Sequence, residues 1–106
     1  MILLFLTTLG CNKIELPEGV PSCVEDKIRK LRRENCPSVQ TVYQYEFQGE
    51  TVYVFNPKPC GSDLFIEVTN QACGTVCNLG GIAGISDCNG DSFYTVATDE
   101  RIIWQD

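Results

Sequence analysis

Hydrophobic and polar residues alternate between Val39 and Phe47, where most odd-numbered positions are apolar or aromatic and most even-numbered ones are polar. A period of two residues is typical of a strand that buries one face. Gln48-Gly49 has the length of a two-residue hairpin turn, and the chain then returns through residues 50–55. The pattern therefore predicts two antiparallel strands that present one apolar face together.

The turn also fixes how these strands pair. It places Tyr45 opposite Val52 and Tyr43 opposite Val54, so that side chains of the same face meet across the hairpin. Tyrosine occurs at positions 43, 45, 53 and 94. Such rings form a stacking platform in some proteins, but on strands they more often pack in the core and across strands. We expect the packing role here.

A second period, of three to four residues, precedes the hairpin and predicts a helix that begins at Ser22 and ends near Pro37. Ser22 and Glu25 have the spacing of a capping box. The apolar stripe of this helix consists of Val24, Ile28 and Leu31. The segment also carries five of the eight lysines and arginines. Acids interleave with them, which favours a solvated face over a basic contact face for anionic lipid or an acidic partner.

Further alternating segments extend the predicted sheet. Residues 64–69 read as a third strand and 75–79 as a fourth, with a turn at Asn70-Gln71 between them, and glycines interrupt regular structure at 80–84. The C-terminal stretch ends in a strand with Trp104 in the core. We predict a single α+β domain over residues 22–106, with one N-terminal helix packed on a four- to five-stranded antiparallel sheet.

Seven cysteines occur in the 106 residues, and there is no histidine. Structural zinc needs four thiolate or imidazole ligands, usually in close pairs, and Cys73 with Cys77 is the only cysteine pair that close. Disulfides are therefore the expected use of the thiols, which implies an oxidising compartment outside the cytosol. They would staple a domain whose core is small.

Helix geometry limits the pairing, because the cysteines at the two ends of the predicted helix would lie roughly 20 Å apart, too far for one bridge. Cys77 and Cys88 bracket the glycine-rich segment, and we expect them to pair. The other bridges would clip the helix to the sheet, in either order: Cys23 and Cys36 with Cys60 and Cys73.

The first ten residues form a short apolar run that ends in a small residue before Cys11. The run is too short to span a bilayer and resembles the apolar region of a signal peptide. This layout predicts a lipoprotein processing site, with residues 1–10 as the signal, a lipid on Cys11, and residues 11–21 as a tether. The alternative is an ordinary signal cleaved nearby, which leaves Cys11 as the odd thiol.

Charge and motifs exclude several functions. The formal net charge of -6 argues against a nucleic-acid partner. Without histidine, no cysteine or serine has an imidazole base, and residues 80–84 lack the context of a phosphate-binding loop. Residues 87–91 loosely resemble a calcium loop, but Thr98 occupies the position of its distal glutamate. We expect neither enzymatic activity nor a cofactor.

From about residue 20 onwards, the chain resembles a family of small exported bacterial proteins known only as a domain of unknown function. The resemblance is carried by YEFQGETVYVF at 45–55, CGSD at 60–63, LGGIAG at 79–84 and IW at 103–104. Members often begin as lipoproteins, which supports the assignment of Cys11. Some members share only Cys60, Cys77 and Cys88, so the resemblance keeps Cys60 open as a partner for either of the other two. It implies no activity.

These observations lead to one functional expectation and one alternative. We expect a non-enzymatic lipoprotein of the cell envelope, which is held at the membrane through Cys11 and acts as a structural or protein-interaction module with an unknown envelope partner. The alternative is a secreted inhibitor, or a small-ligand or calcium-binding module, whose working surface is the loop from Gly80 to Asp91.

Overall fold

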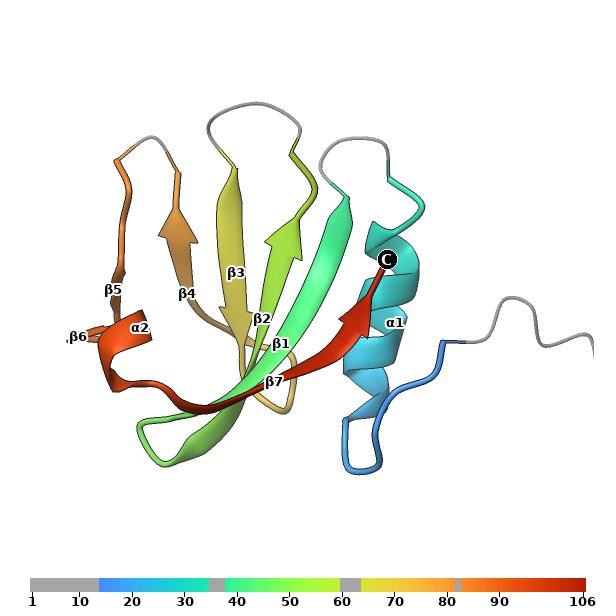
Figure 1. Ribbon diagram of the computed structural model, residues 1–106, viewed down its shortest axis with the longest axis horizontal. Coiled ribbons are helices and arrows are strands. Elements are labelled where there is room, and N and C mark those ends of the chain that lie inside the picture. The colour runs from blue at the N-terminus through green and yellow to red at the C-terminus, as the bar shows by residue number, and fades with distance from the viewer. Residues whose placement is uncertain (1–13, 35–37, 60–63, 82) are drawn as a thin grey trace, which may run out of the picture.

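The computed structural model describes residues 14–34, 38–59, 64–81 and 83–106. Its elements in chain order are α1 (Ser22–Leu31), β1 (Val39–Phe47), β2 (Glu50–Pro57), β3 (Phe65–Thr69), β4 (Thr75–Gly80), β5 (Asp87–Cys88), β6 (Asp91–Ser92), α2 (Phe93–Val96) and β7 (Thr98–Gln105). Five strands form an antiparallel sheet in the order β4-β3-β2-β1-β7, and β5 pairs with β6 (Figure 1). The α+β prediction of one helix before a five-stranded antiparallel sheet is confirmed.

The central hairpin has the predicted register. Tyr45 pairs with Val52 and Tyr43 pairs with Val54. Gln48 and Gly49 have φ values of 52° and 80°, as expected of a turn whose twist matches that of the strands it joins. The length of the turn and the alternation along the strands therefore specify the same register.

The hairpin is buried on both faces, although its alternation predicted burial on one. Residues 52–55 of β2 are all buried, so no side of this central strand is solvated. We call the side of the sheet that packs against α1 the helix face; its core includes Tyr53, Phe55 and Ile103. We call the opposite side the hollow face; its core includes Tyr45, Val54 and Val68. The segment β5, β6 and α2 covers the hollow face and contributes Cys88 and Phe93 to its core. No pattern of hydrophobic and polar residues predicted these three short elements.

Helix α1 packs through the predicted apolar stripe, but its ends differ from the prediction. Val24 and Ile28 are fully buried against the sheet, with Leu31 at the margin. The capping box is wrong, because Pro21 occupies the N-cap and there is no side-chain cap hydrogen bond. The Pro21 carbonyl instead accepts a hydrogen bond from the Val24 amide at 3.0 Å. Ser22 is therefore already helical, and the helix ends at Leu31.

The C-terminal strand β7 also corrects an expectation. Ile103 is 5% exposed and occupies the core of the helix face, whereas Trp104 is only partly buried at its margin. β7 pairs with β1 alone within the sheet, so it lies at an edge where a large ring retains contact with solvent. The prediction of Trp104 as a core residue is wrong, and Ile103 fills that role.

The segment expected to be a tether packs against the domain from Ile14 onwards. Ile14 is 4% exposed, and Leu16 and Val20 contact the same core. Figure 1 shows this stretch running beside the start of α1. Within the described ranges, no helix is both long and apolar enough to cross a membrane.

Candidate functional site

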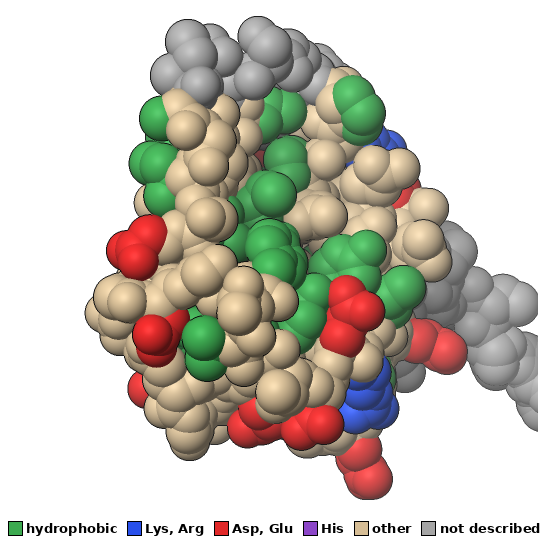
Figure 2. All heavy atoms as spheres, turned by 60° about the vertical axis from the view of Figure 1, so that its left-hand side comes forward, with side chains coloured by type: hydrophobic (Ala, Val, Ile, Leu, Met, Phe, Trp, Pro, Cys, Tyr) green, Lys and Arg blue, Asp and Glu red, His purple; other side chains and the backbone are tan. Residues whose placement is uncertain are grey.

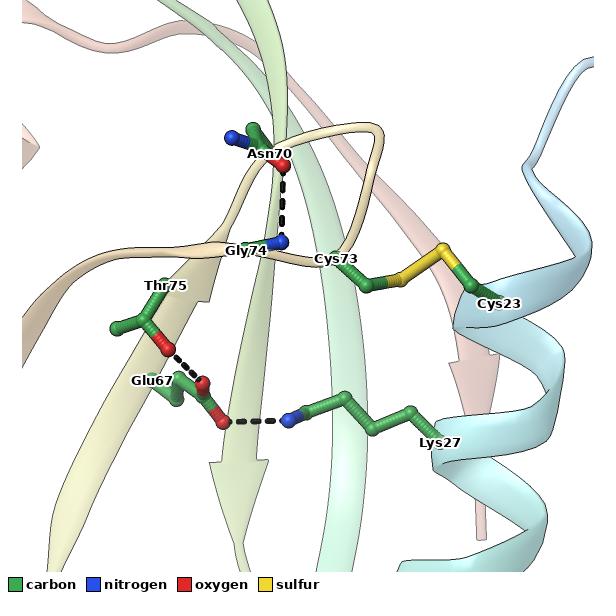
Figure 3. A network of polar contacts seen from close by, with 7 residues as sticks. All are labelled: Cys23, Lys27, Glu67, Asn70, Cys73, Gly74 and Thr75. Carbon is green, nitrogen blue, oxygen red and sulfur yellow. Dashed lines mark hydrogen bonds and ion pairs between the residues drawn. A yellow bond between two sulfur atoms is a disulfide. The ribbon is translucent and has the colours of Figure 1, made fainter.

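A disulfide and an ion pair fasten α1 to the sheet (Figure 3). Cys23 is bridged to Cys73, with a Cα–Cα distance of 6.2 Å, which is one of the two pairings left open for Cys23. One turn further along the helix, Lys27 Nζ lies 2.7 Å from a carboxylate oxygen of Glu67 on β3. The same ammonium lies 5.3 Å from the centre of the Phe55 ring. These contacts place one of the helix's basic residues against the sheet.

The turn between β3 and β4 presents Cys73 to the helix. The Asn70 side-chain oxygen accepts hydrogen bonds from the amides of Ala72 and Gly74, each at 2.9 Å. An asparagine that bonds to the backbone in this way stabilises a tight turn. The predicted turn at Asn70-Gln71 is therefore present, and its geometry positions the disulfide.

Glu67 has a perturbed acidity at this attachment point. Burial raises the pKa of its carboxyl, but hydrogen bonds from Lys27 and Thr75 outweigh burial, so the pKa lies below its ordinary value of 4.5. The Thr75 hydroxyl donates to this carboxylate at 2.6 Å. The contacts among Lys27, Glu67 and Thr75 have a structural role, because each of these polar side chains already binds another one of the three.

The loop from Gly80 to Asp91 is held closely against the sheet. Cys77 and Cys88 form the expected disulfide, with a Cα–Cα distance of 5.4 Å. Gly80 and Ile85 exchange two backbone hydrogen bonds, of 2.7 and 3.0 Å, so the glycine-rich stretch closes as a tight turn. In the described part of the chain, no three His, Cys, Asp or Glu side chains lie close enough together to hold a metal ion.

The β5–β6 turn also contacts the β1–β2 turn. Gln48 Nε2 donates to the Asn89 carbonyl at 3.1 Å and to the Asp91 carboxylate at 2.8 Å. The Asn89 side-chain amide donates back to Gln48 Oε1 at 2.9 Å. Asp91, a carboxylate of the segment that loosely resembles a calcium loop, therefore has a structural partner on another hairpin.

An aromatic cluster forms where β1 meets α2 on the hollow face. The Tyr45 ring lies 5.2 Å from Phe93, 6.1 Å from Tyr43 and 6.2 Å from Tyr94. Phe47 extends the cluster, with its ring centre 4.8 Å from that of Phe93. Perpendicular and tilted rings at these separations attract one another through their edges and faces. Three of the four tyrosines thus converge, and Tyr53 does not join them because it is buried on the helix face.

Glu100 of β7 adds a carboxylate to the cluster. The Tyr45 hydroxyl donates to Glu100 at 2.7 Å. Burial is the main cause that raises the pKa of Tyr45, and the hydrogen bond and charge of Glu100 raise it further. Burial also raises the pKa of Tyr94, with smaller contributions from Tyr43 and Glu100. These phenols therefore keep their protons at neutral pH and can donate hydrogen bonds.

Part of the hollow face remains accessible. Tyr94 and Ile102 are 53% and 50% exposed, and Tyr43 and Ile66 are partly buried beside the core of this face. Figure 2 shows hydrophobic side chains gathered along a hollow on this side of the molecule. An accessible hydrophobic surface next to hydrogen-bonding groups is typical of interaction sites.

Sequence reasoning identified the tyrosines but missed their partners. Glu100 is one of 14 acidic residues, and nothing in the local sequence marks it. Its proximity to Tyr45 arises from the pairing of β1 with β7, which joins residues 55 positions apart. The predicted lipidation site Cys11 and the disulfide candidates Cys36 and Cys60 lie outside the described residues.

Comparison with known families identifies the class of protein. Residues 26–106 match DUF6970, a domain of unknown function. The match covers most of the chain, which therefore belongs to this family. No curated protein and no solved structure matches the chain.

Proposed function

We propose that this protein is a non-enzymatic interaction module of the cell envelope, which binds a partner protein through the accessible part of the hollow face. The observation that carries this proposal is the exposure of Tyr94 and Ile102 beside the aromatic cluster. Burying such side chains against a partner contributes about 25 cal/mol per Å² of apolar surface. Tyrosine is also enriched where proteins bind one another.

The chemistry of the cluster supports binding rather than catalysis. Burial and the neighbouring carboxylate raise the pKa of Tyr45, so it holds its proton at neutral pH. A general base must instead lose and regain a proton near the working pH. The cluster is therefore suited to contact, stacking and hydrogen bonding.

The proposed location is the outer side of a membrane, with a lipid on Cys11. Ile14 is buried in the domain and lies three positions after Cys11. A fully extended chain covers about 3.6 Å per residue, so Ile14 would lie within about 11 Å of the lipidated residue. The domain would therefore sit directly at the membrane surface.

The alternative function as a ligand-binding or inhibitory loop at residues 80–91 has less support. The disulfide to Cys77 and the hydrogen bonds between the two turns give this loop a role in covering the hollow face. Its polar side chains are partly used within the protein. The accessible aromatic surface lies instead on Tyr94 of α2 and Tyr43 of β1, with Ile102 of β7 beside it.

Site-specific photo-crosslinking tests the proposed interface. A benzoylphenylalanine that replaces Ile102 should yield a defined adduct in the envelope fraction of the native host. The same group at Lys30, which is exposed on α1, serves as the matched control and should yield none. Equal labelling from both positions, or no adduct from position 102, would contradict the interface.

A further inference from the structure

We infer that the aromatic cluster and Glu100 recognise a lysine or arginine side chain on a partner segment with apolar neighbours. This inference rests on the proposed function and names the chemistry of the partner. The rings of Tyr43 and Tyr94, the Glu100 carboxylate and the apolar side chain of Ile102 all lie around Tyr45 or beside its neighbour Tyr43 on the hollow face.

The ring surface belongs to Tyr43 and Tyr94. Both rings contact Tyr45, at centre-to-centre distances of 6.1 and 6.2 Å. Tyr94 is 53% exposed and Tyr43 is partly exposed, so a side chain entering from solvent can reach them. Aromatic faces attract ammonium and guanidinium groups that lie within about 6 Å of the ring centre. The internal contacts of Tyr45 hold the cluster in place.

Glu100 supplies a negative charge with spare hydrogen-bonding capacity. One oxygen accepts the Tyr45 hydroxyl, and a carboxylate has further lone pairs available. No ion pair found among residues 14–34, 38–59, 64–81 and 83–106 includes Glu100. The adjacent Arg101 belongs to the opposite face of β7. On that face, burial raises the pKa of Tyr53, and the positive charge of Arg101 acts against this rise.

The apolar floor indicates a charged side chain with hydrophobic neighbours. Ile102 pairs directly with Tyr43, and Ile66 packs against the same core. The aliphatic stems of lysine and arginine lie on such surfaces while their charged ends remain solvated. The net charge of -6 would attract a basic segment over longer distances. Charge and the exposed apolar side chains therefore favour a basic, apolar-flanked peptide of a partner protein.

A matched pair of peptides tests this inference by nuclear magnetic resonance titration of the full, disulfide-bonded chain in non-ionic detergent. The probes are acetyl-Leu-Arg-Leu-amide and the same peptide with neutral citrulline in place of arginine. We expect the arginine peptide to shift signals of Tyr94, Glu100 and Ile102 and to bind roughly tenfold more tightly than the citrulline peptide, since two ring faces and a carboxylate each contribute.

Substitutions at the site should weaken this preference. Glu100→Gln and Tyr94→Leu should each reduce the affinity for the arginine peptide by roughly three- to tenfold, whereas Tyr94→Phe retains a ring face and most of the affinity. Asp26→Asn removes the same charge from an exposed position on α1 and should leave binding unchanged. Retention of the remaining resonances verifies that each variant is folded.

Two results would overturn the inference. One is equal affinity for the two peptides, including the case in which neither binds. The other is arginine-dependent binding whose signals map to residues away from Tyr94 and Glu100. Neither result decides the proposed interface, because crosslinking from position 102 tests that interface without reference to charge.

Discussion

At the scale of single residues, Glu67 connects the helix to the sheet and predicts a dependence of stability on pH. Burial raises its pKa, but the Lys27 and Thr75 contacts lower it below 4.5 overall. Because the folded pKa is lower than the unfolded one, the carboxylate stabilises the fold above about pH 4.5. That contribution is lost as the pH falls through the folded value.

We therefore expect Glu67→Gln to reduce the free energy of unfolding at pH 7 by about 0.5 to 1 kcal/mol. The difference between this variant and the natural protein should shrink on acidification below pH 4.5. Urea unfolding at pH 7 and at pH 3 measures it. Glu18→Gln removes a carboxylate from an exposed position outside this contact and serves as the control. A difference that stays constant between the two pH values would contradict the assignment.

At the scale of elements, the Cys77–Cys88 disulfide holds β5, β6 and α2 over the hollow face. Its partners are separated by 11 positions, so the bridge closes a short loop. Removing it with Cys77→Ala and Cys88→Ala should lower the free energy of unfolding by about 2 to 3 kcal/mol. The loss arises because the unfolded chain regains the freedom that the cross-link removes.

Hydrogen exchange distinguishes a local effect from a global one. In the double variant, amides of β5 and β6 should exchange faster, while amides of the β1–β2 hairpin remain protected except by global unfolding. The Cys23–Cys73 bridge is retained in this variant and keeps α1 in place. Unchanged exchange in β5 and β6 would show that the packing of Phe93 and the Gln48 hydrogen bonds hold the segment without the bridge.

The local sequence predicted the features that depend on interactions between residues close together in the chain. The register between β1 and β2 follows from a two-residue turn and alternating side chains, and both act within 20 residues of chain. Burial of both faces depends on β5 and α2, which pack from more than 30 positions away. In β1 the pairing also shifts between Val39 and Thr41, so Val39 and Val42 join the same core despite their odd and even numbers. A strict period of two could not predict that.

At the scale of the whole molecule, the proposal that a lipid on Cys11 anchors the domain predicts the mass and the location of the native protein. We expect the mass of the intact protein from its native host to include a lipid on the cysteine at position 11, and Cys11→Ser to release the protein from the membrane fraction. Measurement before and after reduction also counts the disulfides. A cleaved, unlipidated N-terminus would contradict the proposed anchoring, and six thiols that can be alkylated without prior reduction would contradict the proposed export.

The sequence by itself determined the central hairpin, the apolar stripe of α1 and the Cys77–Cys88 bridge. Each depends on spacing within a short stretch of chain, where turn geometry and side-chain periodicity act directly. Only the tertiary structure decided which tyrosines meet, that Glu100 lies beside them, and that β2 is buried on both sides. These features depend on contacts between distant segments, because the edge pairing of β7 and the return of α2 across the sheet leave no local pattern in the sequence.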